Sequence, residues 1–128
     1  FYERGLGVPI LLGKRDVVER IAHMEKASLD HVAVVNPETS DELPAFCQRL
    51  ERLERYRNMG LGDARTVLTN HNYFAAMMVQ YGLADALVGG VSSYGGVLLR
   101  PLLNLIKPLP HADVLSSCTI VELERKQF

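Results

Sequence analysis

Glycines separate two apolar runs in the middle of this chain. Residues 84–101 read ADALVGGVSSYGGVLLRP, so a run that suits a strand ends at Gly89 and Gly90. In open α/β sheets, ligands bind beyond the carboxyl ends of the strands. Glycine at such a position permits a tight turn and a close approach of the backbone to a ligand. This junction is therefore the first candidate for a binding site.

The residues after these glycines suit an anionic ligand. Ser92, Ser93 and Tyr94 supply hydroxyl donors, and Arg100 with Pro101 is expected to open the next helix. A helix N-terminus attracts anions, and a guanidinium beside it suits phosphate or carboxylate. A second interpretation stays open, in which the glycines serve only the turn and Arg100 forms a surface ion pair.

The flanking sequence alternates between expected strands and expected helices. Apolar runs predict strands at residues 8–13, 31–37, 84–90 and 114–123. Apolar residues at helical spacing predict helices at residues 14–25, 41–57, 63–68, about 74–81 and 98–107. This alternation predicts an α/β fold, with a mostly parallel sheet and helices on both faces.

Composition narrows the function classes. The chain has 128 residues, of which 48% are hydrophobic, so one domain with a packed core, or part of a larger domain, is expected. A net charge of −1 with interspersed signs gives no electrostatic footprint for nucleic acid. No apolar run approaches the roughly 18 residues that cross a membrane, and no signal peptide is visible. We therefore expect a cytoplasmic protein.

Other reactive side chains show no catalytic or metal-binding spacing. Cys47 and Cys118 are far apart and are expected to be reduced, partly buried thiols. Asp85 is expected to cap an element or to accept a hydrogen bond from a loop N–H, and a general-base role is the less favoured interpretation. The Met77–Met78 pair is expected in the core. No metal site is predicted from the histidines, which stand at positions 23, 31, 71 and 111.

Three segments together resemble a known enzyme family. These are PILLG near the start, NYFAAMMVQYGLADALVGG in the middle and LLRPLLNLIKPLPHADVLSSC after it. In that order they resemble the phosphate acetyl/butyryltransferase family, also called phosphotransacetylases, from residue 8 to about residue 123. The same module forms the C-terminal part of bacterial NADP-dependent malic enzymes, where it mainly senses acetyl-CoA.

The resemblance implies a fold and a chemistry. It implies that residues 1–128 are the N-terminal portion of a two-lobed module, similar to isocitrate and isopropylmalate dehydrogenases, which assembles as a homodimer or larger oligomer. Family enzymes move an acyl group between the sulfur of CoA and phosphate, without a metal in the chemistry. The implied small-molecule partners are acyl-CoA and acyl phosphate, with CoA or acetyl-CoA as substrate or ligand rather than a resident cofactor. No nucleic acid or membrane partner is expected.

The resemblance also assigns site residues. Arg100, in LLRP, matches an arginine that lines the cleft of the family. A second family arginine corresponds to Arg55 or Arg57, within ERYRNMG. Transferases typically carry two threonines in the loop where this chain has Tyr94 and Gly95, and a tyrosine there resembles the malic-enzyme version. The remaining catalytic residues of the family belong to later motifs.

Three hypotheses follow. The first is a regulatory, acetyl-CoA-sensing module of an NADP-dependent malic enzyme, whose parent chain is an oxidoreductase. The second is a fragment of an active phosphate acetyltransferase or butyryltransferase. The third is an unrelated nucleotide-binding α/β domain, although Gly-Lys-Arg after the first expected strand matches neither common phosphate-binding glycine motif.

Overall fold

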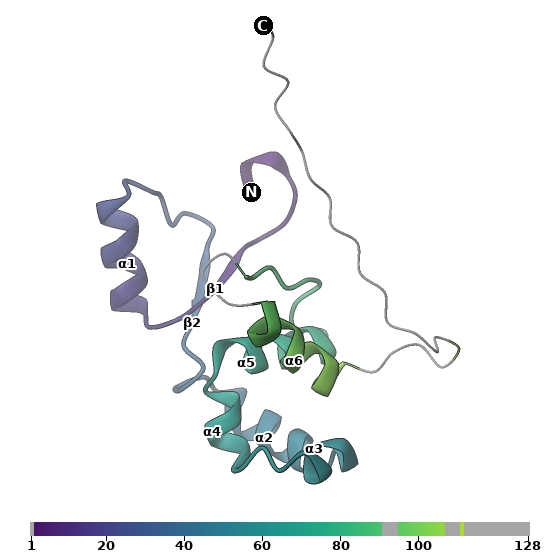
Figure 1. Cartoon of the computed structure of the whole chain (residues 1–128). Helices are drawn as coiled ribbons and strands as arrows, with labels where there is room; N and C mark the ends of the chain where they lie inside the picture. The colour runs from purple at the N-terminus through teal and green to yellow at the C-terminus, as the bar shows by residue number, and fades with distance from the viewer. Residues whose placement is uncertain (1, 91–94, 107–110, 112–128) are drawn as a thin grey trace, which may run out of the picture.

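A computed structural model of the chain describes residues 2–90, 95–106 and 111 (Figure 1). Two short parallel strands are followed by a layer of helices. The elements in chain order are η1 (Tyr2–Arg4), β1 (Ile10–Leu12), α1 (Arg15–Met24), β2 (Ala33–Val35), α2 (Leu43–Glu51), α3 (Glu54–Met59), α4 (Ala64–Leu68), α5 (His71–Gln80) and α6 (Gly95–Leu105).

The strands pair in parallel through the crossover helix α1. Ile10 lies opposite Ala33, and Leu12 lies opposite Val35. Side chains alternate between the faces of a strand, so Ile10, Leu12 and Val35 share one face, and all three pack against the main core. Figure 1 shows α1 on one side of the strands and α5 and α6 on the other. The predicted βαβ unit at the start of the chain is confirmed.

The core lies among the helices that follow the sheet. Phe46 and Phe74 are almost fully buried, and their rings meet edge to face with centroids 5.2 Å apart. Met77 and Met78 are buried as well, which confirms that this pair belongs to the core. The core connects α2, α4 and α5 to α6 through buried residues such as Leu105.

The predicted helix over residues 41–57 is wrong in one respect, because the chain forms two helices there. α2 ends at Glu51, and Leu53 adopts an extended conformation (φ −73°, ψ 116°) before α3 begins. Leu53, at this break, is partly buried and packs against the core. α3 then ends at Gly60, whose φ of +60° favours glycine. The break at Leu53 thus divides a segment that periodicity alone predicts as one continuous helix.

The expected third strand at residues 84–90 is not a strand in the structure. An apolar run forms a strand only where a neighbouring strand accepts its backbone hydrogen bonds, and β1 and β2 are the two strands that pair among the described residues. Val88 is 92% exposed. The fourth expected strand, at residues 114–123, lies outside the described residues.

The last helix begins earlier than its sequence predicts. α6 runs from Gly95 to Leu105, so Pro101 lies inside the helix and not in its first turn. Proline has no N–H to donate to the carbonyl four residues before it, which here belongs to Val97. The side-chain amide of Asn72, on α5, donates to this carbonyl at 3.4 Å. A tertiary contact therefore accommodates a proline that sequence rules assign to a helix start.

Candidate functional site

The Gly89–Gly90 pair lies against α6. A Cβ atom on Gly89 would stand 3.1 Å from Cδ1 of Leu98, and Gly90 has a φ of +107°. Position 90 therefore favours glycine because of its backbone conformation, whereas a side chain at Gly89 would require the end of the Leu98 side chain to shift. These glycines were expected to let the backbone approach a ligand. In the described residues, the backbone instead approaches the side chain of Leu98 on α6.

Arg100 lies on the exposed side of α6. Two residues along a helix are separated by about 200° of rotation, so Arg100 points away from Leu98 and from the glycines that contact Leu98. The Arg100 side chain is exposed. It is not buried against its own helices, so it is free of the arrangement that would exclude a binding role. α6 begins at Gly95 and not at Arg100. The prediction that this arginine lies beside a helix N-terminus is therefore wrong.

The other predicted contacts are spread over the chain. Ser92, Ser93 and Tyr94 lie outside the described residues. Arg55 and Arg57 both lie on α3, and Arg57 is exposed. Figure 1 shows α3 next to α2 at one end of the helical layer. The assignment of these residues to a phosphate or CoA site remains a prediction from the family resemblance.

Two polar contacts fix α6 on α5. Besides the Asn72–Val97 contact, Asn104 Nδ2 donates a hydrogen bond to the hydroxyl of Tyr73 at 3.0 Å, in a partly buried position. Asn72 and Tyr73 are neighbours on α5, whereas their partners stand on either side of Arg100 on α6. Two adjacent residues of α5 therefore hydrogen-bond to the helix that presents Arg100, in addition to the apolar packing of Leu105 in the core.

A cavity of about 390 Å³, here called the strand-edge cavity, opens at the carboxyl ends of β1 and β2. Its apolar wall is formed by Leu12, Val17, Val18 and Ile21. Its polar rim is formed by Lys14, Asn36, Glu38, Thr69 and His71. Carboxyl ends of parallel strands are the usual place for ligands in α/β folds. The cavity is thus a second candidate site, formed by the sheet itself.

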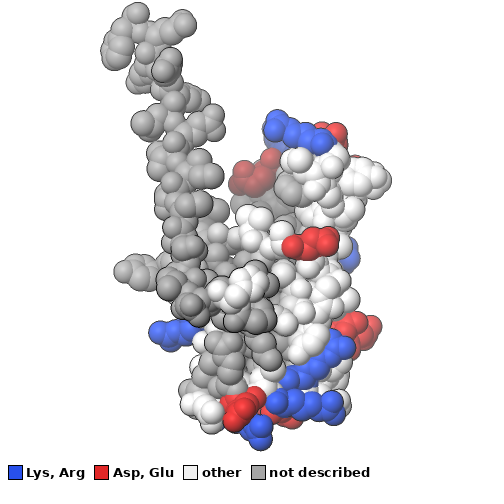
Figure 2. Space-filling model, turned by 90° about the vertical axis from the view of Figure 1, so that its right-hand side faces the viewer, with Lys and Arg blue, Asp and Glu red and all other residues white. Residues whose placement is uncertain are grey.

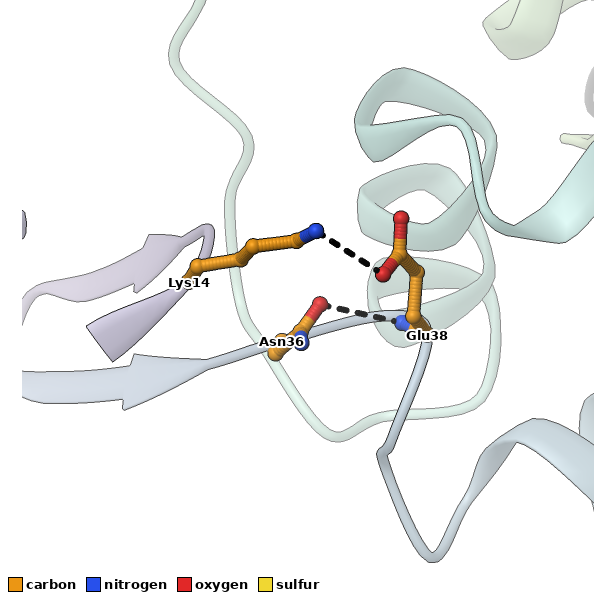
Figure 3. A network of polar contacts seen from close by, with 3 residues as sticks. All are labelled: Lys14, Asn36 and Glu38. Atoms are coloured by element: carbon orange, nitrogen blue, oxygen red, sulfur yellow. Dashed lines mark hydrogen bonds and ion pairs between the residues drawn. The ribbon is translucent and has the colours of Figure 1, made fainter. Parts of the chain in front are cut away.

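The rim of this cavity carries a pair of opposite charges. Lys14 Nζ lies 3.4 Å from Glu38 Oε2, and both side chains are about half exposed. The backbone N–H of Glu38 donates to Asn36 Oδ1 at 3.1 Å, which forms a tight turn directly after β2 (Figure 3). Sequence reasoning missed this site, although Gly13–Lys14 and Asn36–Pro37 each lie at the carboxyl end of a predicted strand. These two positions could have predicted the cavity, because the carboxyl ends of parallel strands lie at the same edge of a sheet.

Cys47 shows no sign of activation. Burial raises the pKa of its thiol above the ordinary value, and the nearby Arg65 offsets this only in part. The carboxylates of Glu51 and Asp63 raise this pKa further. A raised pKa lowers the thiolate fraction, so Cys47 fits the expected inert thiol. Cys118 lies outside the described residues.

The remaining candidates gather into no catalytic group within the described residues. No set of three or more histidine, cysteine, aspartate or glutamate side chains there could hold a metal ion. His31 stacks on Tyr2, with ring centroids 4.0 Å apart, and Asp85 is exposed. On the face drawn in Figure 2, basic and acidic side chains are interspersed. No helix in the described ranges combines the length and the apolar character needed to cross a bilayer.

Comparison with known proteins gives consistent matches. The phosphate acetyltransferase of Helicobacter pylori is 30% identical over 119 residues, which cover 93% of this chain and 23% of that protein. The phosphate acetyltransferase of Thermoanaerobacterium thermosaccharolyticum is 28% identical over 126 residues, which cover 98% of this chain and 38% of that protein. The chain therefore spans between about a quarter and two fifths of the length of these relatives.

A solved structure agrees with these relatives. The EutD phosphotransacetylase from Staphylococcus aureus superposes with a TM-score of 0.73 and 31% identity, over 84% of this chain and 32% of that one. The family model described as phosphate acetyl/butaryl transferase matches residues 1–128. The family resemblance inferred from the three sequence segments is confirmed, and the chain belongs to the phosphate acetyl/butyryltransferase family.

Proposed function

We propose that residues 1–128 are the N-terminal portion of a phosphotransacetylase-like domain that binds acyl-CoA or acyl phosphate. The observation that carries this proposal is the family match over the whole chain, supported by the fold shared with a solved phosphotransacetylase. The finer architecture that we propose is a two-lobed module of the isocitrate dehydrogenase type, with a cleft between its lobes. It works as a cytoplasmic homo-oligomer, a dimer or larger.

In this proposal, Arg100 contacts the anionic end of the ligand. Its guanidinium is permanently charged, exposed and held on a helix that two contacts fix in place. Arg55 or Arg57, Gly90 and the hydroxyls of Ser92, Ser93 and Tyr94 complete the proposed contacts with phosphate or CoA. No metal takes part.

The regulatory version of this function is the first proposal. Tyr94 and Gly95 stand where transferases typically carry two threonines, which favours an acetyl-CoA sensor attached to an NADP-dependent malic enzyme. Acetyl-CoA would then change the activity of the oxidoreductase only through different affinities for two states of the oligomer.

The alternative is an active phosphate acetyltransferase or butyryltransferase, and the relatives of that name support it equally. In that reaction the thiol of CoA loses a proton to a base. Its sulfur then bonds to the acyl carbon, the bond from this carbon to the phosphate oxygen breaks, and inorganic phosphate leaves. The domain must hold thiol and acyl phosphate in near-attack geometry, and its arginines must neutralise the phosphate charge.

A release assay on the full-length protein separates the two versions. Acetyl phosphate and butyryl phosphate are each supplied with CoA, and the free thiol is followed over time. Turnover supports the transferase, whereas binding of acetyl-CoA without turnover supports the sensor. If the protein neither turns over these substrates nor binds acetyl-CoA, the proposed function is wrong.

The Arg100→Ala variant tests the site. We expect at least a tenfold weaker response to acyl phosphate or acetyl-CoA, because a charged hydrogen bond to the ligand is lost. Arg20→Ala is the matched control, since Arg20 is also an exposed arginine on a helix, α1, but has no proposed role. An unchanged response in a folded Arg100→Ala protein removes Arg100 from the site.

A further inference from the structure

We propose that the strand-edge cavity binds a purine base that carries an amino group, as adenine does. This deepens the proposed function, because CoA itself contains an adenine base. A free adenine nucleotide offers the same ring, so the shared chemistry is the base and not the rest of the ligand. Nothing in this inference uses Arg100 or residues 91–94.

The walls of the cavity suit a flat apolar ring. Val17 and Val18 lie about one turn before Ile21 on α1, and all three line the cavity. Ile21 is 53% exposed, although it is a large apolar residue. The volume of about 390 Å³ lies within the usual range of small-molecule sites. A ring placed here would remove apolar surface from water on both partners.

The rim offers donors and acceptors side by side. The Asn36 oxygen has two lone pairs and uses one for the backbone N–H of Glu38, while its amide nitrogen carries two donors (Figure 3). Adenine presents an amino donor next to a ring-nitrogen acceptor, which is the pattern that an asparagine side chain can meet with two hydrogen bonds. Glu38 and Lys14 extend the rim with one further acceptor and one further donor.

The charge of the rim disfavours phosphate as the main ligand group. Lys14 stands beside Glu38, so the carboxylate would repel an anion placed on the ammonium group. Both side chains of this ion pair are about half exposed, and exposed ion pairs contribute little to stability. A neutral ring can therefore separate the two charges at small cost, accept a hydrogen bond from Lys14 and donate one to Glu38.

Binding of adenosine to the full-length protein, measured by titration calorimetry, tests this inference. Asn36→Asp keeps an oxygen for the turn after β2 but removes the amide donor, and Glu38→Gln removes the carboxylate. We expect each variant to bind adenosine at least tenfold more weakly than the parent protein. Arg15→Ala and Glu19→Gln are the matched controls. They alter another exposed ion pair of α1, with N and O 3.5 Å apart, that does not line the cavity.

Ligand analogues give a second readout that does not depend on folding of the variants. Inosine has an oxygen in place of the amino group, so we expect it to bind at least tenfold more weakly than adenosine. Inorganic phosphate should not displace adenosine. The inference is overturned if adenosine does not bind at millimolar concentration, if inosine binds as well as adenosine, or if the Asn36→Asp and Arg15→Ala proteins bind adenosine equally.

Comparison of CoA, AMP and pantetheine identifies the source of the base. If Asn36→Asp weakens CoA and adenosine alike but leaves pantetheine unaffected, the base belongs to CoA. If it weakens AMP and adenosine but not CoA, the base belongs to a free nucleotide. Adenosine binding that survives in a protein without acyl-transfer or acetyl-CoA response supports this inference while the proposed function fails.

Discussion

The side-chain amide of Asn72 donates a hydrogen bond to the carbonyl oxygen of Val97, across the contact between α5 and α6. In a regular helix that carbonyl would accept the N–H of the residue four positions later, but this residue is Pro101. Asn72 therefore supplies the donor that proline lacks. The contact explains how a buried proline is kept inside α6, and it ties the helix that carries Arg100 to the core.

Replacement of Asn72 by alanine leaves the Val97 carbonyl without this donor. We expect Asn72→Ala to lower the free energy of unfolding by about 0.5–1 kcal/mol, the usual contribution of one such hydrogen bond. Urea denaturation of the full-length protein measures this change. Asn58→Ala, at an exposed position on α3, makes the same chemical change and should be close to neutral. Equal losses in the two variants would show that the contact contributes nothing.

The hydrogen bond between Asn104 and Tyr73 gives the second prediction. Tyr73→Phe removes only the hydroxyl, so the free energy of unfolding should fall by about 0.5–1.5 kcal/mol. Adding Asn104→Ala to Tyr73→Phe should cost less than the sum of the single changes, because both remove the same bond. Tyr81→Phe is the matched control, since its ring still stacks on Phe46. Strict additivity in the double variant contradicts this prediction.

Asp63 caps α4. Its carboxylate accepts the backbone N–H of Thr66 at 3.0 Å and the hydroxyl of the same residue at 3.2 Å. Asp63→Ala should lower the free energy of unfolding by about 1 kcal/mol, as loss of an N-cap usually does. Asp63→Asn keeps an acceptor oxygen and should recover most of this loss. If alanine and asparagine are equally harmful, capping is not the role of this side chain.

The thiol of Cys47 should react slowly. Its pKa is raised, chiefly by burial, so less thiolate is present at pH 8 than for a free cysteine. We expect alkylation by iodoacetamide to be slower than in the urea-unfolded protein, and its rate to rise only at higher pH. In a Cys118→Ser background, Cys47 is the thiol of this sequence whose alkylation is measured. The Cys47→Ser variant in the same background gives the signal expected without it.

The raised pKa of Cys47 also makes the free energy of unfolding depend on pH. The folded protein holds the Cys47 proton more tightly than the unfolded chain does, so protonation favours the fold. This contribution is complete below the unfolded pKa and is lost as the pH rises through the folded pKa. A Cys47 thiol that alkylates at the same rate in the folded and unfolded protein would contradict both statements.

Local sequence signals predicted the parts of the fold that depend on neighbouring residues. The apolar runs around Ile10 and Val34 form the two parallel strands, and Asp63, the first residue of the helix predicted at 63–68, caps α4. The inner stripe of α2 is buried, including Phe46 and Leu50. These features depend on periodicity and on side-chain hydrogen bonds within a few residues, and both can be read from the order of the amino acids.

The sequence by itself determined the family, the βαβ start and the core position of Met77 and Met78, because each rests on residue type and short spacing. Only the tertiary structure decided that Pro101 lies inside a helix, that Arg100 faces away from Gly90 and that Lys14 meets Glu38 at the edge of the sheet. Each of these depends on a contact between segments far apart in the chain or on where a helix begins. Such contacts form only when the whole set of elements packs together, so no local pattern specifies them.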